Sequence, residues 1–336
     1  MKVAVLTARG SGGDSGGAER FYDGLVAAFG LAGAEASEVA VTVSEADFDA
    51  IEEAYLRCWD LDVSAYDLVV STKAPTYLVR HPRHVCYLVH TMRVFYDMFD
   101  ETFPRAPEAL GMQRALIQRL DTLALGPANT RHVFAIGHEV ARRLEAFNHL
   151  RAEVMHPPLS FDGFHGGPYG DYVFMPGRLH RWKRVALAIE AMHHVKSPMR
   201  LVIAGSGEQE AELRALAAGE PRVRFLGRIS DGELVRHYAG SLGVVFIPVR
   251  EDYGYVTVEA FRSGKPVVTC ADSGEAASLV RDGGNGFVVE PSAKAVARAL
   301  DRLWEDRAAA AAMGAAGRAF TDTLRWDAIV ANLLAA

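Results

Sequence analysis

The chain has 336 residues, of which 50% are hydrophobic and 23% are charged, and its formal net charge is −6. This composition is that of a globular protein with sizeable cores, and the length suits two domains of about 150 residues each. The acidic balance argues against a dedicated nucleic-acid-binding protein, and the apolar runs are too short to cross a bilayer. Three cysteines without metal-ligand spacing predict buried, reduced thiols in a cytosolic protein.

The chain begins with a short apolar strand, residues 3–6, followed by a glycine-rich loop and a helix from Ala18. Because Met1 and Lys2 lead directly into this strand, no signal peptide is expected. A strand, a glycine loop and a helix open many α/β nucleotide-binding folds. The dinucleotide fingerprint G-x-G-x-x-G fails, however, because Ser15 stands where its third glycine belongs, and no P-loop pattern is present. A nicotinamide-dependent dehydrogenase is therefore a weak alternative.

Apolar strands and helical segments alternate through the rest of the chain, which predicts α/β domains with parallel sheets. Pro157 and Pro158 favour a stiff, extended crossing between two such domains. In the first domain, residues 104–125 are expected to form a helix with an apolar face, and packing in the core is preferred over membrane insertion. The residues of that face are Met112, Leu116, Leu120 and Leu123.

The segment 247–266 carries the strongest functional signal. An apolar strand ends at Pro248, a short loop follows, and a helix begins near Tyr255. This geometry directs backbone N–H groups and the positive end of the helix dipole at an anion. Glu251 in the loop and Glu259 in the helix flank the anion site, with seven residues between them. The arrangement predicts a phosphorylated sugar as the ligand, and two surface glutamates on an ordinary helix are the alternative.

A second cluster, of four cations, follows the predicted strand 172–175. Because the carboxyl ends of parallel strands meet at one edge of a sheet, this cluster is expected to face the same pocket as Glu251. Cations at the start of a helix oppose its dipole, which favours a ligand-binding role over a structural one. Arg178 and Lys183 are the candidates for stabilising the charge of a departing diphosphate. The other two, Arg181 and Arg184, are expected to face solvent.

Several of these segments resemble the motifs of retaining glycosyltransferase family 4. The segment from Glu251 to Glu259 is similar to the Glu-x7-Glu signature of that family, whose usual opening E-G-F-G-L is E-D-Y-G-Y here. Arg178 and Lys183 match its G-R-L-x-x-x-K spacing. The resemblance covers the second domain nearly from end to end.

In the first domain the resemblance is confined to two runs. Gly16-Gly17-Ala18-Glu19 is similar to the G-G-A-E opening of the family. The run Tyr87–Asp97 resembles the Y-x-H-T-P-M-R-Y-x-x-D of mannosyltransferase-like members, without the proline. This resemblance implies that His90 contacts the donor sugar, and it places Thr91 and Arg93 on the acceptor side.

The fold that the resemblance implies is the α/β GT-B fold, in which two doubly wound, Rossmann-like parallel-sheet domains face a central cleft. Residues 1–157 would form the acceptor-binding domain and residues 158–318 the donor-binding domain. Residues 319–336 would form a terminal helix that crosses back to the first domain.

The resemblance also implies roles for individual residues. Glu251 and the backbone of Gly254 to Val256 would hold sugar and phosphate, while Glu259 would hold the ribose hydroxyls. The implied catalytic residues are Glu251, His90, Arg178 and Lys183. The implied donor-binding residues are Gly16, Gly17, Arg178, Lys183, Gly205, Arg228, Ile229, Glu251, Gly254, Tyr255, Val256 and Glu259.

The implied reaction is retaining transfer of a sugar from a GDP- or UDP-sugar to a hydroxyl of a glycan, a lipid-linked molecule or a small molecule, without a metal or other cofactor. The resemblance of His90-Thr91-Met92-Arg93 to the H-T-P-M-R of mannosyltransferase-like members leans towards GDP-mannose. The protein is expected to be cytoplasmic. Its expected location includes the inner face of the membrane, which it would contact weakly as a peripheral protein. The alternative is a catalytically inactive GT-B protein that binds nucleotide sugars as a scaffold.

Overall fold

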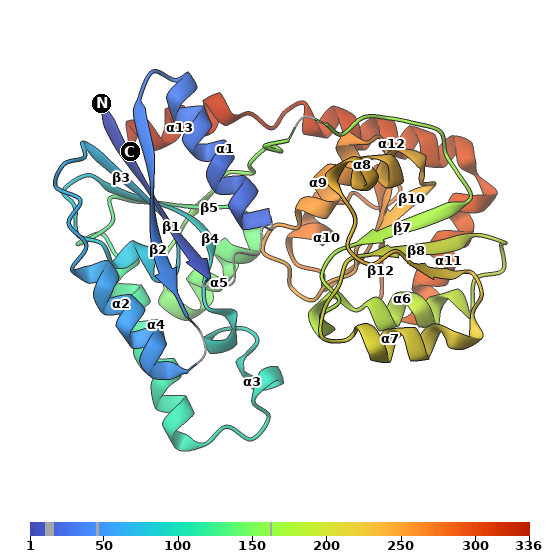
Figure 1. The fold of residues 1–336 in the computed structure, drawn as a ribbon, viewed down its shortest axis with the longest axis horizontal. Helices are drawn as coiled ribbons and strands as arrows, with labels where there is room; N and C mark the ends of the chain where they lie inside the picture. The colour runs from blue at the N-terminus through green and yellow to red at the C-terminus, as the bar shows by residue number, and fades with distance from the viewer. Residues whose placement is uncertain (11–16, 45–46, 162) are drawn as a thin grey trace. The chain divides into compact units, whose positions relative to one another are not determined.

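The computed structural model describes residues 1–10, 17–44, 47–161 and 163–336. The chain divides into two compact units (Figure 1). The first consists of Met1–Ser160 together with Arg325–Ala336, and the second consists of Phe161–Leu324.

The first unit is built on a six-stranded parallel sheet with the strand order β2-β1-β3-β4-β5-β6. Val3, Ala4, Val5 and Leu6 of β1 have no exposed surface, as expected for a parallel strand that is covered on both faces. The strands are β1 (Lys2–Gly10), β2 (Glu35–Val43), β3 (Leu68–Lys73), β4 (His84–His90), β5 (His132–Ala135) and β6 (Glu153–Val154).

Helices of the first unit come from both ends of the chain. The last helix, α13 (Trp326–Ala335), packs on α1 (Gly17–Leu31), where the rings of Phe21 and Trp326 lie 5.8 Å apart. Gly24 permits this contact, since a Cβ there would come within 2.8 Å of the Trp326 ring. The other helices are α2 (Phe48–Trp59), α3 (Phe99–Thr102), α4 (Glu108–Leu125) and α5 (His138–Asn148), with 3-10 turns η1 (Thr76–Leu78) and η2 (Arg93–Phe95).

Helix α4 faces the core with a different side from the one expected. Met112 is 68% exposed, Leu123 63% and Leu116 39%, so the prediction that this apolar face packs in the core is wrong. The buried side instead includes Ile117 and Asp121. The Asp121 carboxylate accepts hydrogen bonds from two buried tyrosines, Tyr55 at 2.8 Å and Tyr96 at 2.6 Å, so this buried charge has partners.

The second unit has its own six-stranded parallel sheet, in the order β12-β11-β10-β7-β8-β9. Its core includes Val173, Leu201, Val245 and Val268 from the central strands. The strands are β7 (Tyr172–Pro176), β8 (Arg200–Ala204), β9 (Val223–Phe225), β10 (Gly243–Val245), β11 (Val267–Cys270) and β12 (Gly286–Val289). The α-helices are α6 (Val185–Met192), α7 (Glu210–Leu216), α8 (Asp231–Gly240), α9 (Tyr255–Arg262), α10 (Glu275–Leu279), α11 (Ala293–Glu305) and α12 (Arg307–Thr321), with 3-10 turns η3 (Arg181–Lys183) and η4 (Ala217–Gly219).

Both strand orders confirm the predicted doubly wound α/β architecture. In the second unit the direction of strand addition reverses between β7 and β10, and such switch points open a crevice at the carboxyl ends of the strands. Among the described residues, no helix is both long and apolar enough to span a membrane.

Candidate functional site

The candidate site of the second unit lies at the switch point between β7 and β10. The loop after β7 carries Arg178 and Lys183, and the loop after β10 carries Glu251 and Gly254. The two loops are joined by their backbones, since the N–H of Val249 donates to the carbonyl of Trp182 at 2.8 Å. Residues that are far apart in the sequence are therefore held at one edge of the sheet.

Lys183 and Glu251 form a direct ion pair. The Lys183 Nζ lies 2.8 Å from Oε1 and 2.6 Å from Oε2 of Glu251, and both side chains are half-buried. The ammonium also lies 5.5 Å from the centroid of the Phe246 ring, a cation–π contact that helps to place it. The structure thus brings a predicted cation and a predicted carboxylate together.

Helix α9 begins beside this ion pair. Gly254 precedes the helix with a φ of 78°, and a Cβ there would come within 2.6 Å of the Phe246 ring, so only glycine fits. The backbone N–H groups of Tyr255 and Val256 belong to the first turn, where no carbonyl of the helix reaches them. The helix start therefore has the geometry of an anion-binding site, and binding of an anion there stays a prediction.

Glu259, one turn further along α9, is 9% exposed and accepts a 2.6 Å hydrogen bond from the Tyr238 hydroxyl of α8. It is therefore a buried carboxylate and not a surface one. The Tyr255 hydroxyl is also buried but has no hydrogen-bond partner among the described residues. Burial, together with the charge of Glu259, raises the pKa of Tyr255, so this phenol stays protonated.

Close backbone packing holds the loops after β7, β8 and β9 together. A Cβ on Gly205 would lie 1.9 Å from the carbonyl oxygen of Gly177, and the Gly205 N–H donates to the Gly227 carbonyl at 2.8 Å. These contacts place the exposed Arg228 and the half-buried Ile229 at the same end of the sheet as the exposed Arg178.

One support of the site was missed by sequence reasoning. Arg184 was expected to face solvent, but its guanidinium makes two hydrogen bonds to the carboxylate of Asp272, of 2.7 and 2.5 Å, and holds the pKa of that carboxyl below its usual value. The same loop accepts backbone hydrogen bonds from Arg250 and Glu251 through the carbonyls of Asp272 and Ser273. An acidic residue two positions after strand β11 was the available signal.

The predicted residues of the first unit lie at the carboxyl end of β4. His90 is the last residue of the strand and is half-buried, whereas Thr91 and Arg93 are buried. Arg93 lies 3.7 Å from Asp97, which also pairs at 2.9 Å with the buried Arg143 of α5. Arg143, which sequence reasoning missed, reaches the Thr91 hydroxyl at 3.5 Å. Thr91 and Arg93 are therefore part of a buried polar cluster.

The predicted glycine pair at the start of the chain is only partly visible. Gly16 lies outside the described residues, and Gly17 is the exposed first residue of α1.

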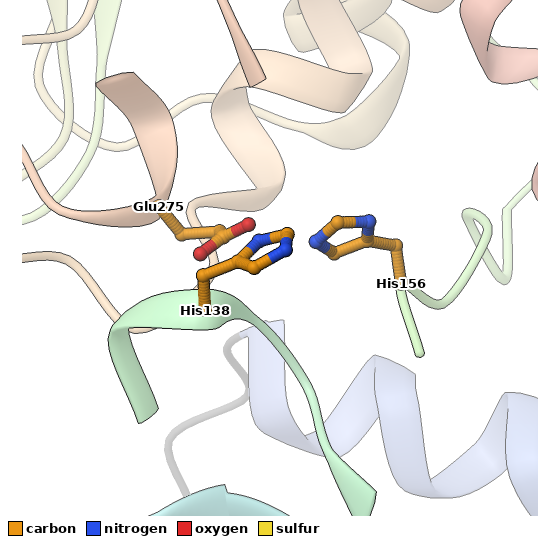
Figure 2. A group of neighbouring side chains, drawn as sticks. All are labelled: His138, His156 and Glu275. Carbon is orange, nitrogen blue, oxygen red and sulfur yellow. The ribbon is translucent and has the colours of Figure 1, made fainter. Parts of the chain in front are cut away.

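Two histidines of the first unit face each other. His138 opens α5, His156 follows β6, and their ring centroids lie 5.4 Å apart (Figure 2). The third residue drawn there, Glu275, is the first residue of α10 in the second unit. Zinc sites ordinarily use three or four protein ligands, so the two imidazoles by themselves do not make such a site.

Comparison with known proteins finds similarities that lie mainly in the second unit. Residues 169–320 match the family model of the group 1 glycosyl transferases. The GDP-mannose-dependent alpha-(1-6)-phosphatidylinositol monomannoside mannosyltransferase of Mycobacterium tuberculosis is 39% identical over 147 residues, which is 40% of this chain and 37% of that protein. The chain thus covers 37% of the length of this curated relative.

Two solved structures resemble the whole chain. Sucrose-phosphate synthase from Thermosynechococcus elongatus has a TM-score of 0.79 at 18% identity, covering 99% of this chain and 97% of that one. HepE from Anabaena, in complex with UDP and glucose, has a TM-score of 0.75 at 17% identity, covering 100% and 99%. At such identities the likeness concerns the fold, and it confirms the predicted GT-B architecture. Residues 169–320 are therefore similar to the group 1 glycosyl transferases, in a chain with the GT-B fold.

Proposed function

We propose that the chain is a retaining glycosyltransferase that moves a sugar from a nucleotide-sugar donor to the hydroxyl of an acceptor. The observation that carries the proposal is the Lys183–Glu251 ion pair beside the start of α9. Three groups lie at one switch point. The cation and the helix N-terminus suit the phosphates of such a donor, and the carboxylate suits its sugar hydroxyls.

The proposed chemistry follows from the charge that develops as the nucleoside diphosphate leaves. Lys183, Arg178 and the N–H groups at the start of α9 would stabilise that charge, and one such group commonly contributes about 3 kcal/mol. Glu251 would orient the sugar hydroxyls and Glu259 those of the ribose. Retention would follow when the acceptor attacks the face that the diphosphate leaves, with a departing phosphate oxygen taking the acceptor's proton. His90 would contact the sugar.

GDP-mannose is the proposed donor, and the reaction is proposed to need no metal. The name of the mycobacterial relative specifies GDP-mannose, in agreement with the resemblance of His90-Thr91-Met92-Arg93 to a mannosyltransferase motif. The HepE structure, by contrast, contains UDP. UDP-sugars are therefore the competing donors in any test. The acceptor would be a glycan, a lipid-linked molecule or a small molecule with a free hydroxyl.

Weak contact with an anionic membrane surface is part of the proposal. On α4 the exposed residues Met112, Leu116 and Leu123 lie on one side, together with the exposed Arg119. Apolar side chains beside a basic one suit a surface of negatively charged lipid headgroups. In the same helix, the only acidic residue after Glu108 is the buried Asp121.

The proposal predicts that one class of nucleotide sugar raises the melting temperature and is slowly hydrolysed, with or without Mg²⁺. GDP-, UDP-, ADP- and dTDP-sugars would be compared on the wild type and on Arg178→Ala. Loss of one charged group at the phosphates should lower affinity about 10-fold or more.

Arg200→Ala is the matched control, because Arg200 opens β8 at the opposite end of the strand and pairs with Asp171 at 2.6 Å. This variant should keep the wild-type response. If no nucleotide sugar changes the melting temperature, the transferase proposal fails. Binding of a donor without hydrolysis or transfer would instead favour the inactive scaffold.

A further inference from the structure

Glu259 is held in place by a side chain from another helix. Tyr238 of α8 is fully buried, and its hydroxyl donates a 2.6 Å hydrogen bond to Oε2 of Glu259 across 21 residues of sequence. A hydrogen bond from a phenol to a carboxylate is charge-assisted, so it is shorter and stronger than a bond between neutral groups. This contact restrains one oxygen of the carboxylate and limits rotation of the group.

The ring of Tyr238 is itself fixed by two aromatic neighbours. Phe174 of β7 lies 5.2 Å away at an interplanar angle of 84°, and Phe164 lies 5.4 Å away at 83°, both edge-to-face. Phe164 belongs to the segment before β7, which runs close along the end of α8. A Cβ at Gly167 would come within 2.6 Å of the Ala239 carbonyl oxygen. The Tyr238 hydroxyl therefore has little freedom to move.

We propose that Tyr238 is a positioning residue that aims the Glu259 carboxylate at the ribose hydroxyls of the nucleotide. The inference rests on the proposed function, which assigns the ribose to Glu259. A carboxylate has about four lone-pair sites, so it can accept hydrogen bonds from Tyr238 and from ribose hydroxyls together. A carboxylate whose plane is already fixed loses less conformational entropy on binding.

This role has a specific consequence for ligand selection. An oriented carboxylate raises the affinity for a ligand that has hydroxyl donors and does not raise it for a ligand that lacks them. The contribution of Tyr238 is therefore measured by how far the preference for a ribonucleotide over its dideoxy analogue falls when the Tyr238 hydroxyl is removed. A general packing role would change the affinity for both ligands alike.

The test is calorimetric titration of wild type and Tyr238→Phe with GDP and 2′,3′-dideoxy-GDP, and with UDP and its dideoxy analogue. Phenylalanine keeps both edge-to-face contacts and removes only the hydroxyl. The ribose preference should fall about 10-fold, the scale of one hydrogen bond to a charged group, while the affinity for the dideoxy analogue stays the same. Tyr172→Phe is the control, because the Tyr172 hydroxyl also bonds to α8, at the His237 carbonyl, 2.9 Å away.

A double-mutant cycle with Glu259→Gln decides whether Tyr238 acts through Glu259. In the Glu259→Gln background, Tyr238→Phe should cause no further loss of ribose preference. Independent, additive losses would overturn the inference, as would an equal loss of affinity for the ribo and dideoxy ligands. Phe164→Leu, which keeps the hydroxyl but loosens the ring, gives a second variant and should lower the preference by a smaller factor.

The outcomes separate this inference from the function on which it rests. A wild type that binds none of the four nucleotides contradicts the proposed function and the role of Tyr238 with it. A wild type that prefers ribose, combined with a Tyr238→Phe variant that keeps the full preference, overturns the positioning role alone.

Discussion

Gly254 and Gly227 both have positive φ angles, of 78° and 70°, in loops at the carboxyl edge of the second sheet. Their surroundings differ. A Cβ at Gly254 would come within 2.6 Å of the Phe246 ring, whereas a Cβ at Gly227 would meet nothing within 4 Å. A single residue thus sets how close the start of α9 can come to β10, and with it the position of the backbone N–H groups proposed to bind phosphate.

These two glycines predict different costs for the same substitution. Gly227→Ala should lower the free energy of unfolding by about 1 kcal/mol, the strain of a left-handed alanine. Gly254→Ala adds the clash with Phe246, which typically costs another ~1–3 kcal/mol, and it should weaken nucleotide binding by displacing the helix start. Urea unfolding and nucleotide titration would measure both effects. Equal losses of unfolding free energy in the two variants would show that the contact between position 254 and Phe246 adds no cost.

At the scale of an element, α4 is a helix whose buried side differs from the side that its apolar spacing predicts. The spacing of its leucines and methionine predicted an apolar core face, but the bonds from Tyr55 and Tyr96 to Asp121 turn a mixed face inward. Burying one carboxylate without partners would cost several kcal/mol, so the two hydrogen bonds offset the burial of Asp121 while Ile117, Ala124 and Leu125 pack on the same side. The apolar stripe is left on the surface.

The exposed stripe predicts a contrast among substitutions within α4. Leu116→Ser and Leu123→Ser should change the free energy of unfolding by less than about 1 kcal/mol, because no core contact is lost. Ile117→Ala, in the buried side, should cost about 2–5 kcal/mol. Co-sedimentation with phosphatidylglycerol vesicles should decrease in the two serine variants. Unchanged sedimentation would remove the stripe as the membrane contact.

At the scale of the whole molecule, two buried groups of the first unit give opposite pH dependences. Burial lowers the pKa of His84 to about 4, so stability is lost as the pH falls from 6.5 towards 4, where the unfolded chain binds the extra proton. Burial raises the pKa of Asp121 to about 6, so the folded chain takes up the proton first as the pH falls. The contribution of this group to the free energy of unfolding therefore increases on acidification from pH 6 towards 4. Over this range the two effects oppose each other.

Asp121→Asn should therefore lose stability on acidification more steeply than the wild type. Between pH 6 and 4 the variant keeps the proton uptake of His84 but lacks the opposing group, and one uncompensated proton corresponds to about 1.4 kcal/mol per pH unit. Hydrogen exchange of the β4 amides, measured across this range, would report the opening of the first unit. The same slope in both proteins would mean that Asp121 is ionised throughout.

The sequence by itself determined the alternation of strands and helices, the two parallel sheets and the edge at which Lys183 and Glu251 meet. Continuous apolar strands such as residues 3–6 must be buried on both faces, and the carboxyl ends of parallel strands share one edge. Those rules act locally along the chain or follow from topology, so they can be read without coordinates. The assignment of roles to the individual site residues stays a prediction.

Tertiary structure alone decided which side of α4 is buried and which side chains support the site. The contacts of Arg143 with Asp97, Arg184 with Asp272 and Tyr238 with Glu259 join residues 46, 88 and 21 positions apart. Each depends on how two elements pack, because a charged or hydroxyl group is buried only where the opposite element supplies its partner. No spacing within one element encodes such a pairing.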